Sequence, residues 1–397
     1  MSNALRVARR ARLPDPVRLE RYRANPSLGP RLLFFSGGTA LREVSRRLTR
    51  YTHNSIHLIT PFDSGGSSAR LRRAFRMLAV GDLRNRLMAL ADNSVLGQPE
   101  IFSLFAYRFP RKADNERLRQ RLAGMVDGRD RRIAAIGHPM RKIIRTHLRF
   151  FQEQMPRDFD LRGANIGNLI LAGGYLSQSR HIDPVIYLFS KLVEVRGTVR
   201  PVTNRSLHLV AELRDGNLLV GQHLLSGKEE PPIGSPVARL FLSRKLRDPE
   251  PARVEVRRRV EKLIAEADLI CYPMGSFYSS VIANLLVQGV APAIAANDVP
   301  KVFVPNLGED PEQLGLDLVG SIETLLDYLR QGCGEEISAT QLLQYVLIDR
   351  EAARADPEIV ARVESLGVQP VPVPLVTEAS QPLIDGEQLV QSLLSLT

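Results

Sequence analysis

The chain has 397 residues, of which 44% are hydrophobic, enough for one large domain or two ordinary ones. No apolar run is long enough to cross a membrane, and none near Met1 has the pattern of a signal peptide, so we expect a cytoplasmic protein. Its two cysteines, Cys271 and Cys333, are too few for a disulfide framework or a cysteine metal cage.

Positive charge is concentrated at one end of the chain. Residues 1–150 hold 31 Lys and Arg against 11 Asp and Glu, a net charge of +20 that the remainder reduces to +11. Such a field attracts nucleic acid, an anionic surface or a phosphorylated small molecule. We expect a solvated arginine-rich face rather than nucleic-acid binding, because no aromatic-rich basic groove or nucleic-acid module accompanies the charge.

The first hundred residues predict an extension followed by alternating strands and helices. Residues 1–30 are arginine-rich with four prolines and little periodicity, which favours an extension laid on the surface. The apolar run 32–35 predicts a buried strand, residues 41–48 have helical apolar spacing, and 56–60 predict a second strand. Strand, helix and strand in this order indicate a parallel unit with a right-handed crossover.

Helical patterns then dominate. One helix is predicted from Ala69 and another after Gly81, with Asp82 placed to cap it. Residues 99–160 are basic, highly charged and almost without strand signals, so we interpret them as a helical insertion that forms a lid or a wall beside the site.

Strands return at residues 193–242, where Asp215-Gly216 between two apolar runs predicts a hairpin. A helix at 251–268 leads to a second strand, glycine turn and helix, and further strands are predicted within 301–307 and 343–349. The alternation favours an α/β fold: a Rossmann-like, doubly wound, mostly parallel sheet. We assign residues 31–98 and 161–397 to it.

The first glycine turn contains Gly37, Gly38 and Thr39 and joins the first strand to a helix. A turn at the carboxyl end of a parallel strand exposes backbone N–H groups and the positive end of a helix dipole, and both favour phosphate. We expect the glycines to let an anion approach and Thr39 to add a hydroxyl donor. A tight turn that needs no ligand explains this turn alone equally well.

The second turn places Asp63 just after a strand and before two glycines. Asp63 is our candidate catalytic and metal-binding residue, either holding Mg²⁺ against a diphosphate or orienting or deprotonating an attacking hydroxyl. The phosphate- or nucleotide-binding residues predicted beside it are Gly65, Gly66, Ser67, Ser68 and Arg70. The alternative is that Ser67 is an ordinary helix cap and the arginines form a solvated face.

A third turn has Gly275 and Ser276, with Tyr278 and Ser279 at the start of the following helix. Ligands of doubly wound sheets bind where the strand order reverses, so we expect the three turns to converge there.

A fourth stretch offers Asn165 and Asn168, able to bind a base, sugar or amide, although asparagine in a Gly-rich stretch is more often a turn or cap residue. No metalloprotease or serine-hydrolase motif occurs. We expect His138 and His147 at the surface and Cys271 in the core.

Five stretches together resemble the CofD-like family, which includes the 2-phospho-L-lactate transferase of deazaflavin coenzyme synthesis and YvcK-type gluconeogenesis factors. They are FFSGGTALREVSRRL, TPFDSGGSSARLRRAFRMLAVGDLRNRLMALAD, GANIGNLILAGGYLS, EVRGTVRPVT with LHLVAELRDG, and CYPMGSFYSSVIANLLV. The resemblance implies a Rossmann-like fold, a ligand at the glycine turns and a homodimer. Two departures stand out: Ser64 replaces a second acidic residue, and PMGSFYSS is similar to the YvcK pattern rather than to that of the transferase.

Three hypotheses follow. The first is a protein that binds a nucleotide diphosphate and acts as a Mg²⁺-dependent transferase of a phosphorylated group, as the transferase branch implies. The second is a non-catalytic sensor of nucleotide sugars in the YvcK manner. The third is an RNA-associated or scaffolding protein that uses residues 1–150.

Overall fold

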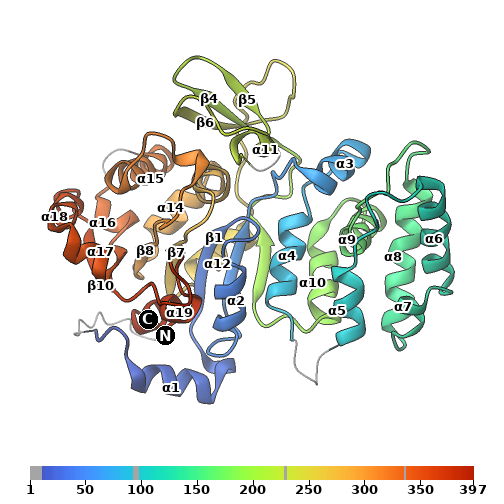
Figure 1. Cartoon of the computed structure of the whole chain (residues 1–397), viewed down its shortest axis with the longest axis horizontal. Helices are drawn as coiled ribbons and strands as arrows, with labels where there is room; N and C mark the ends of the chain where they lie inside the picture. Colours follow the sequence, from blue (N-terminus) through green and yellow to red (C-terminus); the bar gives the residue numbers. More distant parts are fainter. Residues whose placement is uncertain (1–10, 93–97, 228–229, 335–336) are drawn as a thin grey trace.

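A parallel sheet of seven strands forms the centre of the molecule, with strand order β10-β9-β8-β7-β1-β2-β3 (Figure 1). The computed structural model describes residues 11–92, 98–227, 230–334 and 337–397. The strands are β1 Leu32–Ser36, β2 Ile56–Ile59, β3 Thr198–Pro201, β7 Leu269–Tyr272, β8 Lys301–Phe303, β9 Tyr345–Asp349 and β10 Gln369–Val373. Every neighbouring pair is parallel, which confirms the Rossmann-like α/β prediction.

Helices cover both faces of the sheet because its strands present apolar side chains on both faces. Leu32 and Phe34 of β1 pack into one core, whereas Leu33 and Phe35 pack into the other. The first core also includes α1 Pro16–Ala24, α2 Arg42–Leu48 and α19 Gly386–Ser395. The second includes α12 Arg258–Ala265, α13 Ala283–Leu285, α14 Val290–Ala295, α15 Leu318–Cys333, α16 Ala339–Leu342, α17 Arg350–Ala355 and α18 Pro357–Ser365.

A helical lobe lies beside β3, on the right in Figure 1. It comprises α3 Gly66–Phe75, α4 Gly81–Ala89, α5 Pro99–Ala106, α6 Asn115–Asp127, α7 Arg131–Ala134, α8 Met140–Gln154, α9 Ile166–Ser177 and α10 Ile182–Leu192. The predicted insertion 99–160 is indeed helical, but the lobe extends beyond it because α3, α4, α9 and α10 share its apolar core. His147, predicted at the surface, is buried in this lobe, whereas His138 is exposed as predicted.

A small antiparallel sheet stands above the strand ends in Figure 1, with order β5-β4-β6. It consists of β4 His208–Leu213, β5 Leu218–Val220 and β6 Val237–Ser243. The short helix α11 Gln222–Leu225 lies between β5 and β6 in the chain. The hairpin predicted at Asp215-Gly216 is confirmed, with Gly216 at a φ of 85°. The region 193–242 therefore contributes to two sheets rather than one, since only β3 joins the parallel sheet.

Two segments of the chain differ from their predicted forms. Residues 16–24, predicted as part of a surface extension, form α1, which packs on α19 through Leu19, and Asp15 N donates to Ser395 Oγ at 2.8 Å. Residues 1–10 of that extension lie outside the described residues. The helix predicted at 251–268 is limited to α12. In the described ranges, no helix has the length and apolar character needed to cross a membrane.

Candidate functional site

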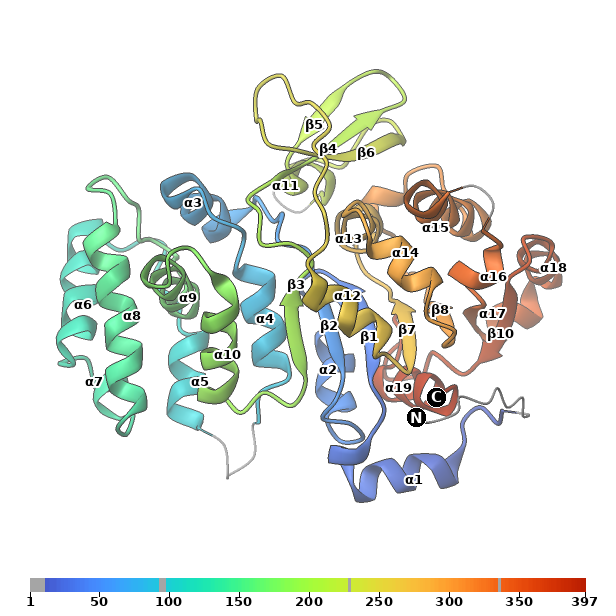
Figure 2. The same cartoon turned by 180° about the vertical axis from the view of Figure 1, so that it is seen from behind.

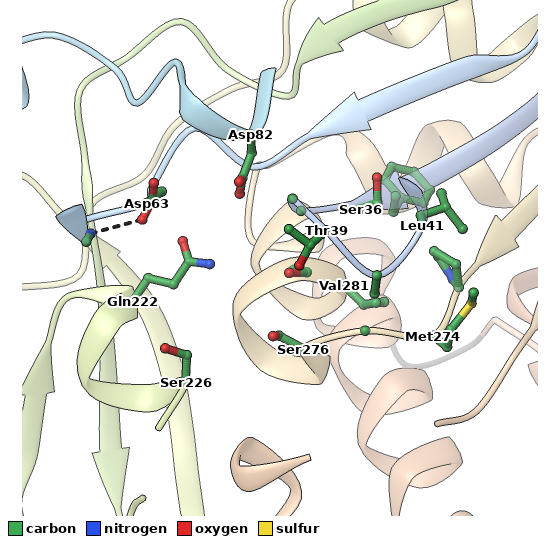
Figure 3. A pocket seen from close by; sticks show the side chains of 18 of the residues that line it. Ser36, Thr39, Leu41, Asp63, Asp82, Gln222, Ser226, Met274, Ser276 and Val281 are labelled. Atoms are coloured by element: carbon green, nitrogen blue, oxygen red, sulfur yellow. Dashed lines mark hydrogen bonds between the residues drawn. The ribbon is translucent and has the colours of Figure 1, made fainter. Parts of the chain in front are cut away.

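A cavity opens where the strand order of the sheet reverses. The chain adds β2 and β3 on one side of β1, then returns to add β7, β8, β9 and β10 on the other side. At the carboxyl ends of β1 and β7 lies a cavity of about 170 Å³ (Figure 3). Seven predicted residues line it: Gly37, Gly38, Thr39, Asp63, Gly65, Gly275 and Ser276. Residues of all three turns therefore meet at the position expected for a doubly wound sheet.

The first turn supplies backbone donors to this cavity. Because α2 begins only at Arg42, residues 37–41 form an open turn after β1. Within the described part of the chain, the N–H groups of Gly38, Thr39 and Ala40 donate to no other group. All three residues line the cavity, so their donors are available to an anion.

Arg86 lies beneath the first turn and holds it open. The side chain is fully buried, and its guanidinium donates to the carbonyl oxygens of Leu41 at 2.8 Å and Gly37 at 3.2 Å, and to Ser45 Oγ. Burial lowers its pKa to about 10, against the opposing effect of Asp82, so the group is charged at neutral pH. With its carbonyls bound from below, the turn can present its N–H groups to the cavity.

Side-chain packing explains the two glycines of the first turn. Neither Gly37 nor Gly38 has a positive φ, so backbone freedom does not require glycine here. A Cβ on Gly38 would lie 2.2 Å from Asp82 Oδ1, and one on Gly37 would lie 2.3 Å from Ser280 Oγ. The glycines leave room for these two side chains, a role different from the predicted approach of an anion.

Two carboxylates face the cavity, Asp63 from the second turn and Asp82 from the start of α4 (Figure 3). Asp63 Oδ1 accepts a hydrogen bond from Gly65 N at 2.9 Å, which fixes its orientation. The prediction that Asp82 caps a helix is wrong, because α4 begins at Gly81 and has no side-chain cap. Asp82 instead packs against the first turn, and sequence reasoning missed it as a site residue.

The donor set suits a small divalent cation. Mg²⁺ prefers oxygen ligands and is commonly held by one or two carboxylates together with substrate phosphates. Asp63 and Asp82 offer such oxygens on the same cavity as the backbone donors. The described ranges contain no group of three or more metal-ligating side chains, so phosphate oxygens and water would complete the coordination.

The other predicted residues of the second turn lie outside the cavity lining. The alternative that Ser67 is a helix cap is also wrong, because the N-cap of α3 is Gly65 and no side chain caps the helix. Ser67 Oγ accepts from Asn168 Nδ2 at 3.3 Å, and Ser68 is buried. Arg70 forms an ion pair with Asp160 at 3.1 Å, which directs it to the helical lobe.

The backbone N–H donors of the third turn already have partners in another segment of the chain. After it comes a π-helix, η2 Phe277–Ile282. The N–H groups of Gly275, Phe277 and Ser279 donate to Asn306 Oδ1 at 2.7 Å, Asp310 Oδ2 at 2.8 Å and Glu312 Oε2 at 2.7 Å. Tyr278 and Ser279 are buried and do not line the cavity. Of the four residues predicted here, Gly275 and Ser276 line the cavity, together with the unpredicted Met274 and Ser280.

The asparagines of the fourth stretch have structural partners. Asn165 is the N-cap of α9, where its Oδ1 accepts from Asn168 N at 3.0 Å and its Nδ2 donates to Tyr107 O at 3.1 Å. Neither asparagine lines the cavity. Gln222, His223 and Ser226, at and just after α11, line it instead and were not predicted, because no local motif marks them.

Comparison with known proteins agrees with the fold. A family model described as 2-phospho-L-lactate transferase CofD matches residues 32–381. The gluconeogenesis factor of Listeria monocytogenes serovar 1/2a is 28% identical over 335 residues, covering 84% of this chain and 83% of the relative. The gluconeogenesis factor of Bacillus subtilis strain 168 is 27% identical over 375 residues, covering 92% and 97%.

Two further similarities extend this comparison. A putative gluconeogenesis factor from Nostoc sp. is 30% identical over 331 residues, which cover 82% of this chain. The match spans only 56% of that longer protein. A crystal structure of a UPF0052 family member from Bacillus halodurans has a TM-score of 0.65 at 24% identity, covering 92% of this chain and 99% of the other, which supports the fold alone. Since the family model matches most of the sequence, this chain belongs to the CofD family.

Proposed function

We propose that the protein binds the diphosphate of a nucleotide-type ligand, such as a nucleotide sugar, in the cavity between β1 and β7. The observation that carries this proposal is that three N–H donors, at Gly38, Thr39 and Ala40, have no partner among the described residues and share one cavity with two carboxylates. A volume of about 170 Å³ accommodates phosphate groups, and the rest of a nucleotide would extend out of the cavity.

Asp63 and Asp82 would hold Mg²⁺, which would neutralise phosphate charge. The carboxylates alone would repel a diphosphate, so binding of such a ligand should depend on the cation. Arg86 adds a fixed positive charge under the turn, where burial strengthens its effect.

The same arrangement suits transfer of a phosphorylated group. In such a reaction an acceptor hydroxyl attacks phosphorus, the bond to the nucleotide leaving group breaks, and the hydroxyl proton passes to a base. Asp63 would be that base in place of its role as a Mg²⁺ ligand. Positioning and charge neutralisation account for most of the catalysis in this chemistry, so no nucleophilic side chain is required.

A non-catalytic sensor of nucleotide sugars is the second candidate. The names of the Listeria and Bacillus subtilis relatives, gluconeogenesis factor, favour it. Asp310 and Glu312 accept hydrogen bonds from N–H groups of the third turn. This also favours a sensor, because these donors are not available to a reacting phosphate. Incubation with nucleotide donors and candidate alcohol acceptors separates the two functions, since only a transferase releases the nucleotide product.

Thermal unfolding with nucleotides and nucleotide sugars, with and without Mg²⁺, tests the binding proposal. We expect at least one of these ligands to raise the unfolding temperature in the presence of Mg²⁺. Asp63→Asn and Asp82→Asn should abolish the Mg²⁺-dependent part, and Asp158→Asn, which alters an exposed carboxylate away from the cavity, should retain it. Stabilisation by none of the ligands would refute the proposal, and tight, salt-dependent RNA binding instead would favour the third hypothesis.

A further inference from the structure

A second cavity lies between α3 and the three-stranded sheet. Figures 1 and 2 both show α3 beside α11 and this sheet. The cavity has a volume of about 590 Å³, and its walls include Arg72, Arg73, Arg76 and Arg244. Among the described residues that line it there is no carboxylate. We name this cavity the arginine cleft.

Three of the four arginines of this cleft have no acidic partner among the described residues. Arg73, Arg76 and Arg244 are exposed and form no ion pair within the described ranges. Arg72 is buried and donates to the carbonyl oxygens of Phe62 at 2.8 Å and Leu207, so it is fixed in place. Positive charges gathered around one cavity repel one another, and a bound anion would relieve that repulsion.

A hydrogen-bonded pair lies where the arginine cleft borders the central cavity. Ser64 Oγ and His223 Nδ1 are 2.8 Å apart, and His223 lines both cavities. Asp63, next to Ser64 in the chain, faces the central cavity. A molecule in the cleft would therefore lie close to the ligand of the central cavity, across this pair.

We propose that the arginine cleft is a second anion site, which binds the phosphate or carboxylate groups of a second small molecule. In a transferase this molecule would be the acceptor, and in a sensor it would be an effector. Only this assignment of roles rests on the proposed function, because the cleft's anion binding follows from its own residues. A volume of about 590 Å³ is within the range of small-molecule sites.

Calorimetric titration at low ionic strength and without divalent cations tests the site, with pyrophosphate and citrate as separate probes for phosphate and carboxylate. The Arg73→Gln/Arg244→Gln double variant should bind the preferred probe weaker by roughly tenfold or more, because each lost charge-assisted bond costs about one power of ten. The control variant Arg117→Gln/Arg131→Gln removes two exposed arginines of the helical lobe and should bind as the wild type does.

Ser64, which pairs with His223 between the two cavities, provides an independent variant. Ser64→Asp adds a carboxylate beside the cleft and should weaken binding of the probe by a similar factor, whereas Ser64→Ala should not. Neither result requires a ligand in the central cavity, so failure of the proposed function leaves this test intact. Equal affinities in the two arginine double variants would overturn the proposal. A uridine oligonucleotide that binds more tightly than either probe, and loses affinity equally in both variants, would also overturn it by indicating a general basic surface.

Discussion

Replacement of Gly38 by alanine tests how the first turn and Asp82 fit together. The new methyl group would lie 2.2 Å from Asp82 Oδ1 and 3.0 Å from Asp82 Cγ, so the carboxylate must move. Gly38 has no positive φ, and the backbone itself therefore accepts alanine. Any destabilisation should come from the contact with Asp82 alone.

The magnitude follows from two opposing effects. Forcing an extra methyl group into a packed site costs about 1–3 kcal/mol. Replacing glycine by alanine at a compatible backbone position contributes about 0.4–1 kcal/mol of stability through the unfolded state. We expect a net loss of roughly 1 kcal/mol for Gly38→Ala, and a small gain when Asp82 is already alanine, so the coupling energy should exceed about 1 kcal/mol.

Urea denaturation of the wild type, the two single variants and the double variant measures this coupling. Gly137→Ala is the matched control, because a Cβ at Gly137 meets no atom within 4 Å. It should have the same effect on stability with and without Asp82→Ala. If Gly38→Ala also costs the same in both backgrounds, the contact with Asp82 does not determine the glycine.

Three further predictions concern buried groups. Arg86→Met should lower the free energy of unfolding in urea by about 2–4 kcal/mol, because it leaves the buried carbonyls of the first turn without donors, whereas Met at the exposed Arg149 should change it little. His57 is fully buried and its pKa is lowered well below the usual value, mainly by burial, so the unfolded state binds the extra proton as pH falls below about 6.5. Stability should then fall by up to about 1.4 kcal/mol per pH unit, and denaturation of His57→Phe should show a shallower slope than the wild type between about pH 4.5 and 6.5; an unchanged slope would contradict this. Cys271 is buried with a raised thiol pKa, so a thiol reagent should label it only on unfolding, and labelling in the native state would show that the strand opens.

The sequence predicts the parts of this fold that depend on local pattern. The apolar run of β1, the helical spacing after it and the run of β2 are short-range signals, and together they indicate a parallel unit with a turn at its carboxyl end. The reversal of strand order then brings the first and third turns together, which a doubly wound sheet requires.

Residues whose role depends on tertiary contacts were misread or missed. Asp82 has the position of a helix cap in sequence, but its neighbour Gly38 comes from another turn. In the sequence, Arg86 resembles any polar residue of a helix, and no local pattern indicates that it lies beneath the first turn. Asp310 and Glu312 follow η2 by about thirty residues, so the sequence did not reveal that they occupy the donors of the third turn.

A crystal structure with UDP-N-acetylglucosamine and Mn²⁺, with the metal located by anomalous scattering, is the most direct test of the central claim. We expect the diphosphate to accept hydrogen bonds from the N–H groups of Gly38, Thr39 and Ala40, and the Mn²⁺ peak to lie between Asp63 and Asp82. A diphosphate bound away from the first turn, or a metal that contacts neither carboxylate, would contradict the account.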